Sequence, residues 1–293
     1  MIIGARTGAW AKSGSPTPAA YGGLCFTAEA DNSSVQLTAV KVEQVVTLVK
    51  SFDGVNWEAY AVGEVIDLPS TGDYVYLAAG EGGNETFGSS LTKYHKFVIN
   101  GLVAASGDIT SLRRFDLEQT TLANYCYNSM FKGCTGLTSA PELPATTLAS
   151  SCYRYMFNGC TGLTSTPELP ATTLADNCYY SMFNGCTGLT SALELPATTL
   201  AGSCYRSMFT GCTGLTSAPE LPATTLAGSC YHSMFTGCTN ISLIKVHFTA
   251  WGTQTSGWVT NVKSTGTFYK PTALPEEFET SSIPPGWTVV NID

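Results

Sequence analysis

The chain has 293 residues, of which 44% are hydrophobic and only 12% are charged, and 14 Lys and Arg against 22 Asp and Glu leave a net charge of −8. This composition predicts a folded protein with a neutral polar surface and excludes a disordered chain. It also argues against a nucleic-acid partner, which needs a positive stripe. Only three histidines are present, His95, His232 and His247, so acid–base and metal chemistry have few of their usual groups.

The first residues lack the apolar core of a secretion signal, and no stretch reaches the roughly 18 apolar residues that a transmembrane helix needs. We therefore expect no signal peptide, no transmembrane segment and no membrane insertion. The protein is expected to stay in the cytoplasm or to leave by a route without a signal, such as virion release at lysis. Gly, Ser, Pro and Ala dominate residues 12–23, and residues 1–23 are predicted to form a docking arm or linker.

Residues 24–105 carry short runs of alternating hydrophobicity, which are separated by turn signals such as Asp53-Gly54. This spacing predicts an antiparallel β-sandwich. The stretch SFDGVNWEAYAVG, residues 51–63, resembles the paired strands of immunoglobulin-like modules in bacterial surface and phage proteins. The resemblance implies an immunoglobulin-like domain over residues 24–105.

A repeat fills residues 106–247. The string that begins at Leu137 returns with a period of 26 at Leu163, Leu189 and Leu215, and weaker copies precede and follow it. Such a period predicts a solenoid, whose apolar ends need lids. Residues 248–293, with Trp251, Trp258 and Trp287, are predicted to be a C-terminal cap.

Each repeat divides into two halves. In the first half, residues 149–158 are predicted to be a short helix with Gly159 as its stop, because four apolar residues recur at a spacing of four: Leu148, Cys152, Met156 and Cys160. In the second half, residues 163–170 contain two prolines, which cannot donate to a ladder, so the predicted strand is short. Equivalent strands are expected to pair in a parallel sheet, one strand per repeat.

The repeat also carries a recognisable motif. Its MF-x-G-C-x-x-L core, followed by Leu-Pro, resembles the BspA-like bacterial-surface leucine-rich repeat family; the residues are Met156, Phe157, Gly159, Cys160, Leu163, Leu169 and Pro170. This unit differs from the commoner one by additional residues around the prolines and by Met in place of Ala before Phe. With the resemblance, the predicted fold class is α+β: an immunoglobulin-like β-sandwich, then a leucine-rich-repeat α/β solenoid, then a cap.

Ten of the eleven cysteines form pairs with seven residues between them inside the repeats. On a helix their Cα atoms would lie about 12 Å apart, which is too far for a disulfide. We expect reduced, buried thiols, although bridges between adjacent repeats stay open. No C-x-x-C occurs and no histidine repeats with the cysteines, so no zinc, other metal or cofactor is predicted.

Two columns of residues are candidate ligand-binding sites. One is the variable position after the repeated Tyr, predicted to face outward, with Asn128, Arg154, Tyr180, Arg206 and His232. Such residues suit recognition, yet freedom from packing gives the same pattern. The other is acidic, with Glu142, Glu168, Glu194 and Glu220 expected to face solvent. It is either a set of solvated carboxylates or a stripe that engages a cationic ligand.

No phosphate loop, nucleophile elbow or HExxH motif occurs, so no catalytic residue is assigned and the chain is predicted not to be an enzyme. The segment MIIGARTGAWAKSG, residues 1–14, resembles short docking leaders of appendage proteins in gut bacteriophages. The resemblances imply a virion surface protein that displays a leucine-rich-repeat module for a host cell-surface protein or polysaccharide. The arm and the sandwich would then contact other virion proteins. The alternatives are a virion decoration or spacer without its own ligand, and a bacterial cell-surface adhesin.

Overall fold

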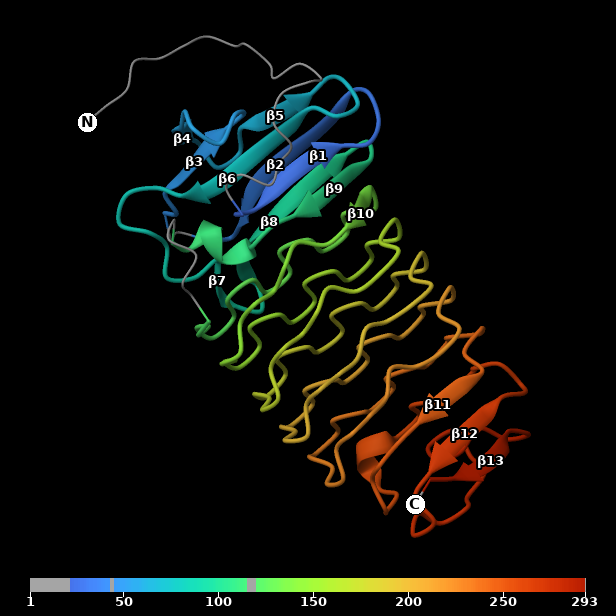
Figure 1. The fold of residues 1–293 in the computed structure, drawn as a ribbon. Helices are drawn as coiled ribbons and strands as arrows, with labels where there is room; N and C mark the ends of the chain where they lie inside the picture. The colour runs from blue at the N-terminus through green and yellow to red at the C-terminus, as the bar shows by residue number, and fades with distance from the viewer. Residues whose placement is uncertain (1–21, 43–44, 115–119, 293) are drawn as a thin grey trace.

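The computed structural model describes residues 22–42, 45–114 and 120–292. Its N-terminal part contains two sheets (Figure 1). The larger sheet has the order β10-β9-β1-β6-β3-β4, and its strands are β1 (Cys25–Ala28), β3 (Leu48–Ser51), β4 (Glu58–Tyr60), β6 (Tyr74–Ala79), β9 (Val103–Ser106) and β10 (Leu137–Ser139). The smaller has the order β5-β2-β8-β7, with β2 (Ser33–Val40), β5 (Val65–Leu68), β7 (Gly88–Ser90) and β8 (Lys93–Asn100).

Alternating side chains of these strands build a shared core. Val35 and Leu37 of β2 and Phe97 of β8 are buried, and the Phe97 ring lies 4.9 Å from that of Phe26 in β1. All pairs within the two sheets are antiparallel except β9 with β10, where Leu137 of the repeat pairs with Val103. The larger sheet therefore continues directly into the first repeat unit. The predicted docking arm, residues 1–23, lies outside the described residues except for its last two positions.

The predicted leucine-rich-repeat α/β solenoid, and with it the α+β fold class, is wrong. The described residues contain no α-helix, and their only helical elements are two short 3₁₀ turns, η2 (Ile109–Leu112) and η3 (Thr253–Thr255). None of the three sheets forms a solenoid. The structure is a β-rich fold in which the repeat units, here called rungs, are irregular coils lying side by side (Figure 1).

The predicted helix over residues 149–158 is instead a ribbon of turns that repeats every four residues. Its backbone N–H groups alternate: Arg154 donates within the rung to the Ser151 carbonyl at 3.4 Å, and Tyr155 donates to Tyr180 of the next rung at 3.0 Å. Every fourth residue has a positive φ, 58° at Ser151, 57° at Tyr155 and 76° at Gly159. A helix with 3.6 residues per turn would rotate a strict four-residue pattern by about 120° over twelve residues. The ribbon keeps that pattern on one side.

The predicted parallel sheet of one strand per repeat is also largely absent. Between β10 and β11 (Leu243–Lys245), the described residues show only isolated parallel bridges, such as Ser165 with Ser191 and Thr173 with Thr199. Pro167 and Pro170 have no N–H to donate, which interrupts a ladder at those positions.

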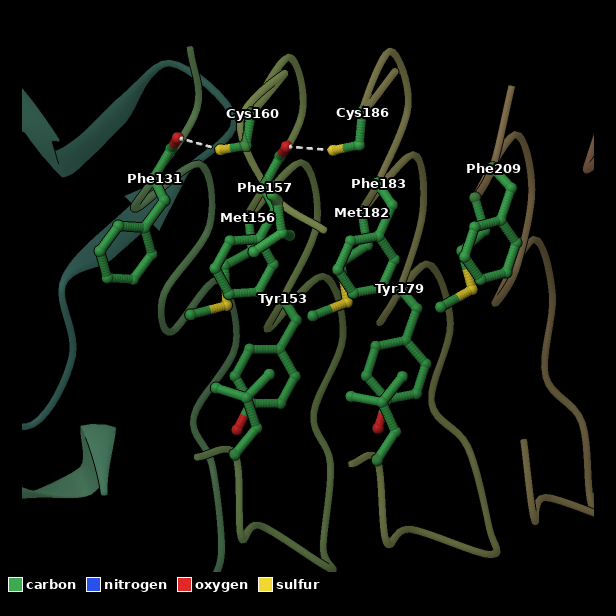
Figure 2. Packing of buried hydrophobic residues seen from close by; sticks show 14 of the residues in the cluster. Phe131, Tyr153, Met156, Phe157, Cys160, Tyr179, Met182, Phe183, Cys186 and Phe209 are labelled. Carbon is green, nitrogen blue, oxygen red and sulfur yellow. Dashed lines mark hydrogen bonds between the residues drawn. The ribbon is translucent and has the colours of Figure 1, made fainter. Parts of the chain in front are cut away.

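Aromatic columns run through the rungs instead. Rings of Phe131, Phe157, Phe183, Phe209 and Phe235 follow one another at centroid distances of 5.4, 5.5, 5.6 and 5.9 Å. Figure 2 shows part of this column beside a parallel column of tyrosines. Phe97 of β8 closes one end at 5.1 Å and Trp258 closes the other at 6.1 Å. The N-terminal sheets and the C-terminal region thus cover both apolar ends.

The cysteines are all free and buried, so the prediction of reduced core thiols is confirmed and bridges between adjacent repeats are absent. From Cys160 onward, the thiol at the end of each turn ribbon also donates to the preceding rung. Cys160 donates to the Phe131 carbonyl and Cys186 to the Phe157 carbonyl, each at 3.0 Å (Figure 2). Burial raises the pKa of Cys186 to about 12, which keeps the donor protonated.

The C-terminal region contains a parallel sheet in the order β11-β12-β13, with β12 (Thr267–Lys270) and β13 (Thr288–Asn291). Trp258 and Trp287 are buried and belong to the same core cluster as Phe268 of β12. Across the described residues, no helix has the length and hydrophobicity needed to span a membrane.

Candidate binding surface

The variable column lies on the turn ribbons. Arg154, Tyr180, Arg206 and His232 are half-buried, whereas the tyrosine before each of them is buried. Asn128, the fifth member, does not face outward as predicted. It is 0% exposed and its amide donates to the Ser90 carbonyl of β7 at 3.2 Å. The smaller N-terminal sheet covers the first rung at this position, so Asn128 holds that contact and is removed from the candidate site.

Three members of the column join two further residues in a continuous series of contacts, which we call the arginine row. The Arg154 guanidinium lies 3.8 Å from the centre of the Tyr180 ring and 4.9 Å from that of Tyr155. The Arg206 guanidinium, from the rung after Tyr180, lies 5.8 Å from the centre of the same ring. The Lys132 ammonium lies 5.1 Å from the centre of the Tyr155 ring. Cations and rings thus alternate along four successive rungs.

Lys132 and Tyr155 were not predicted as site residues. The equivalents of Tyr155 in the other rungs are serines, Ser129, Ser181, Ser207 and Ser233, and the equivalents of Lys132 are Asn or Thr. Both positions therefore vary between copies, and that variation was the available signal. The contact of Lys132 with Tyr155 depends on how far side chains reach between rungs, which the repeat spacing alone does not give.

Arg154 has hydrogen-bond donors to spare. One terminal nitrogen is 3.3 Å from the Asn177 side-chain oxygen and the other is 3.3 Å from the Tyr155 hydroxyl. Its Nε is buried and has no hydrogen-bond partner in the structure. A guanidinium carries five N–H donors, so these two long contacts leave most of them unused.

The cations of the row also lack acidic partners. No carboxylate lies within ion-pair distance of Lys132, Arg154 or Arg206 in the part of the chain that the structure describes. At the end of the row, burial and the nearby charge of Arg206 lower the pKa of His232, whose Nδ1 is 2.9 Å from the Ser233 hydroxyl. His232 is therefore neutral at pH 7, and the row's charge comes from Lys132, Arg154 and Arg206.

The acidic column is placed as predicted for three of its members. Glu142, Glu168 and Glu194 are exposed. Glu220 is not free, because it accepts from Lys245 at 3.0 Å and contacts His247, and the hydrogen bond from Lys245 lowers its pKa. No group of three or more His, Cys, Asp or Glu among the described residues is arranged to hold a metal ion. Three members of the column are therefore exposed carboxylates, and the fourth is engaged within the chain.

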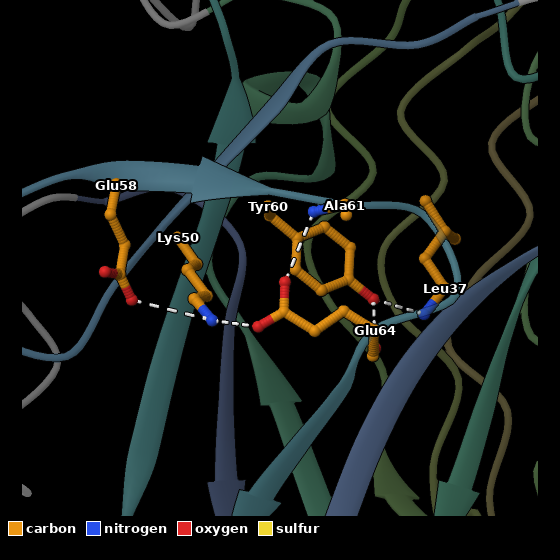
Figure 3. Close-up of polar contacts among 6 residues, drawn as sticks. All are labelled: Leu37, Lys50, Glu58, Tyr60, Ala61 and Glu64. Carbon is orange, nitrogen blue, oxygen red and sulfur yellow. Dashed lines mark hydrogen bonds and ion pairs between the residues drawn. The ribbon is translucent and has the colours of Figure 1, made fainter. Parts of the chain in front are cut away.

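A second polar cluster joins the two N-terminal sheets (Figure 3). Lys50 contacts Glu64 and lies 3.5 Å from Glu58, and the Tyr60 hydroxyl donates to the Glu64 carbonyl at 2.9 Å. The same hydroxyl accepts from the Leu37 N–H at 2.8 Å. These groups satisfy one another, so the cluster is a structural link between β2, β3 and β4.

Comparison of the chain with family models, with curated proteins and with solved structures gives no match. The resemblances to the BspA-like family and to gut bacteriophage appendage proteins therefore stay predictions. The arginine row is the candidate site that the geometry supports best.

Proposed function

We propose that this chain is a non-enzymatic phage virion surface protein whose arginine row binds a protein or glycan on the surface of a bacterial host. The observation that carries the proposal is the row itself. Its two guanidinium groups rest on tyrosine rings, hold unused donors and have no acidic partner among the described residues. Such a surface can donate hydrogen bonds to acceptors outside the chain.

Packing between the rungs does not require these residues. Ser181, Ser207 and Ser233 occupy the position of Tyr155 in other rungs, and those rungs form the same turns with φ between 50° and 55°. Tyr155 itself adopts a φ of 57°, which a bulky residue rarely does. Because a serine fits the same position, the packing of the rungs leaves this residue free for a role in binding.

The stacking of arginine on tyrosine favours binding for a second reason. A free arginine loses considerable side-chain entropy when a ligand immobilises it, and a ring that already holds the guanidinium reduces that cost. Arg154, at 3.8 Å from the Tyr180 ring, is the better held of the two arginines.

The placement on a virion has separate support, the likeness of residues 1–14 to docking leaders of phage appendage proteins. Those residues lie outside the described part of the chain. In the proposal, the arm and the N-terminal sheets contact other virion proteins, and the rungs project toward the host.

Binding of the labelled full chain to intact cells from a panel of gut bacteria tests the proposal. We expect at least one strain to be bound, and the triple variant Arg154→Ala, Tyr180→Ala, Arg206→Ala to lose that binding while its melting temperature stays close to that of the unaltered chain. The matched control replaces Glu142, Glu168 and Glu194 by Ala and should bind as before.

Two results would contradict the proposal. Equal binding by the triple variant would place the site elsewhere on the chain. The second result is that no strain is bound and that infection or attachment is unaffected when one 26-residue unit is deleted. It would favour the alternative of a virion spacer protein without its own ligand.

A further inference from the structure

The faces of the tyrosine rings in the arginine row are already occupied. Arg154 lies 3.8 Å above Tyr180 and Arg206 lies 5.8 Å from the same ring. Tyr155 contacts Lys132 at 5.1 Å and Arg154 at 4.9 Å, and meets the Tyr180 ring edge to face at 5.5 Å. A neutral sugar is usually held by a free aromatic face, and these two rings offer little of one. The chemistry left for a ligand consists of N–H donors on positive groups.

The charge of these donors selects among ligands. Lys132, Arg154 and Arg206 have no carboxylate within ion-pair distance in the described residues, although the whole chain carries a net charge of −8. Carboxylates and phosphates form shorter and stronger hydrogen bonds with guanidinium than neutral acceptors do. An anionic group is therefore the best match for the row.

The two arginines are separated by 52 residues, which is two periods of 26, and Tyr180 lies on the rung between them. Neighbouring backbones that hydrogen-bond as these do lie about 5 Å apart, so the two guanidinium groups are separated by on the order of 10 Å along the stack. A linear polymer that runs along the stack, across successive rungs, would meet both arginines if it carried a negative group at every second sugar. A compact ligand with a single charge would reach only one of them.

We infer that the arginine row binds a linear anionic polysaccharide, whose successive carboxylate or phosphate groups pair with Arg154 and Arg206 while Lys132 extends the same positive edge. This inference rests on the proposed function and names its ligand class. Tyr180 acts as a positioning residue, because it holds both guanidinium groups and reaches the ligand through them.

Titration of the full chain with three polymers tests the inference: polygalacturonate, which carries carboxylates, polyribosylribitol phosphate, a polysaccharide with phosphates in its backbone, and neutral dextran. We expect binding to one or both charged polymers, weakening as salt is raised, and none to dextran. Which charged polymer binds more tightly distinguishes the two sources of negative charge.

Variants locate the site. The double variant Arg154→Gln, Arg206→Gln should raise the Kd by at least about tenfold for each arginine lost. The control Lys41→Gln, Lys263→Gln removes the same charge from two exposed lysines outside the row and should change the Kd by less than about threefold. Tyr180→Leu should weaken binding, whereas Tyr180→Phe keeps the ring and should preserve it.

Equal binding to dextran, or an unchanged Kd for the double arginine variant, would overturn the inference. Cells bound through the row while neither charged polymer binds would also overturn it, and the proposed function would stand. If neither the polymers nor intact cells bind, both fail together.

Discussion

Replacement of Phe183 by Ala probes the packing that positions the arginine row. Phe183 is 0% exposed and its ring is stacked between Phe157 at 5.5 Å and Phe209 at 5.6 Å, with interplanar angles of 4° and 9°. Truncation of a buried Phe to Ala costs about 3 to 5 kcal/mol. Because two ring contacts of about 0.5 to 1.5 kcal/mol each are lost at once, we expect a value in the upper half of that range.

Urea unfolding followed by tryptophan fluorescence measures this loss, since Trp258 closes the phenylalanine column 6.1 Å from Phe235. An unchanged m-value would show that the rungs of the variant still unfold together. A lower m-value would show that the rungs on the two sides of residue 183 unfold separately. The control Phe278→Ala removes a ring that is 47% exposed and should cost less than about 1 kcal/mol. A loss below about 1 kcal/mol for Phe183→Ala would refute the close packing of the column.

Three further predictions concern stability and reactivity. Gly214→Ala should cost about 3 kcal/mol, because its Cβ would lie 2.6 Å from the Leu189 backbone oxygen. Gly211→Ala, with φ +73° and its nearest contact at 3.9 Å, should cost only about 1 to 2 kcal/mol. Similar urea midpoints for the two variants would refute this difference. Burial lowers the pKa of His95 below its ordinary 6.5, so the unfolded chain takes up the proton first and stability should fall below about pH 6.5. His95→Gln should flatten this dependence in urea melts at pH 7 and 5, and parallel losses would contradict the assignment. All eleven cysteines should resist a thiol reagent at pH 8 until urea is added, because they are buried and have raised pKa values such as that of Cys186. A thiol that reacts quickly in the folded protein would contradict this prediction.

Sequence reasoning correctly predicted that Cys152, Met156 and Cys160 are buried, and it failed on the backbone that carries them. Cys152, Met156 and Cys160 recur at a spacing that fits either one face of a helix or a turn that repeats every four residues. The discriminating signal was the run of small or Gly residues at Asn177, Ser181 and Gly185, which tolerate the positive φ that such turns need. An α-helix has a negative φ at every residue, so it does not require such residues at every fourth position.

The candidate site was predicted in part for a similar reason. Arg154, Tyr180 and Arg206 were found because they vary where packing leaves them free. Asn128 follows the same pattern but faces β7, and only the tertiary arrangement shows that the first rung is covered there. Lys132 and Tyr155 belong to other positions of the repeat, so a single column could not include them.

A crystal structure of the full chain with a short oligogalacturonate bound is the most direct test of the arginine row as the binding surface. The account predicts sugar rings that follow the stack across successive rungs, with carboxylate oxygens within hydrogen-bond distance of both Arg154 and Arg206. Sugar bound along Glu142, Glu168 and Glu194, or on the N-terminal sheets, with both arginines left uncontacted, would contradict it.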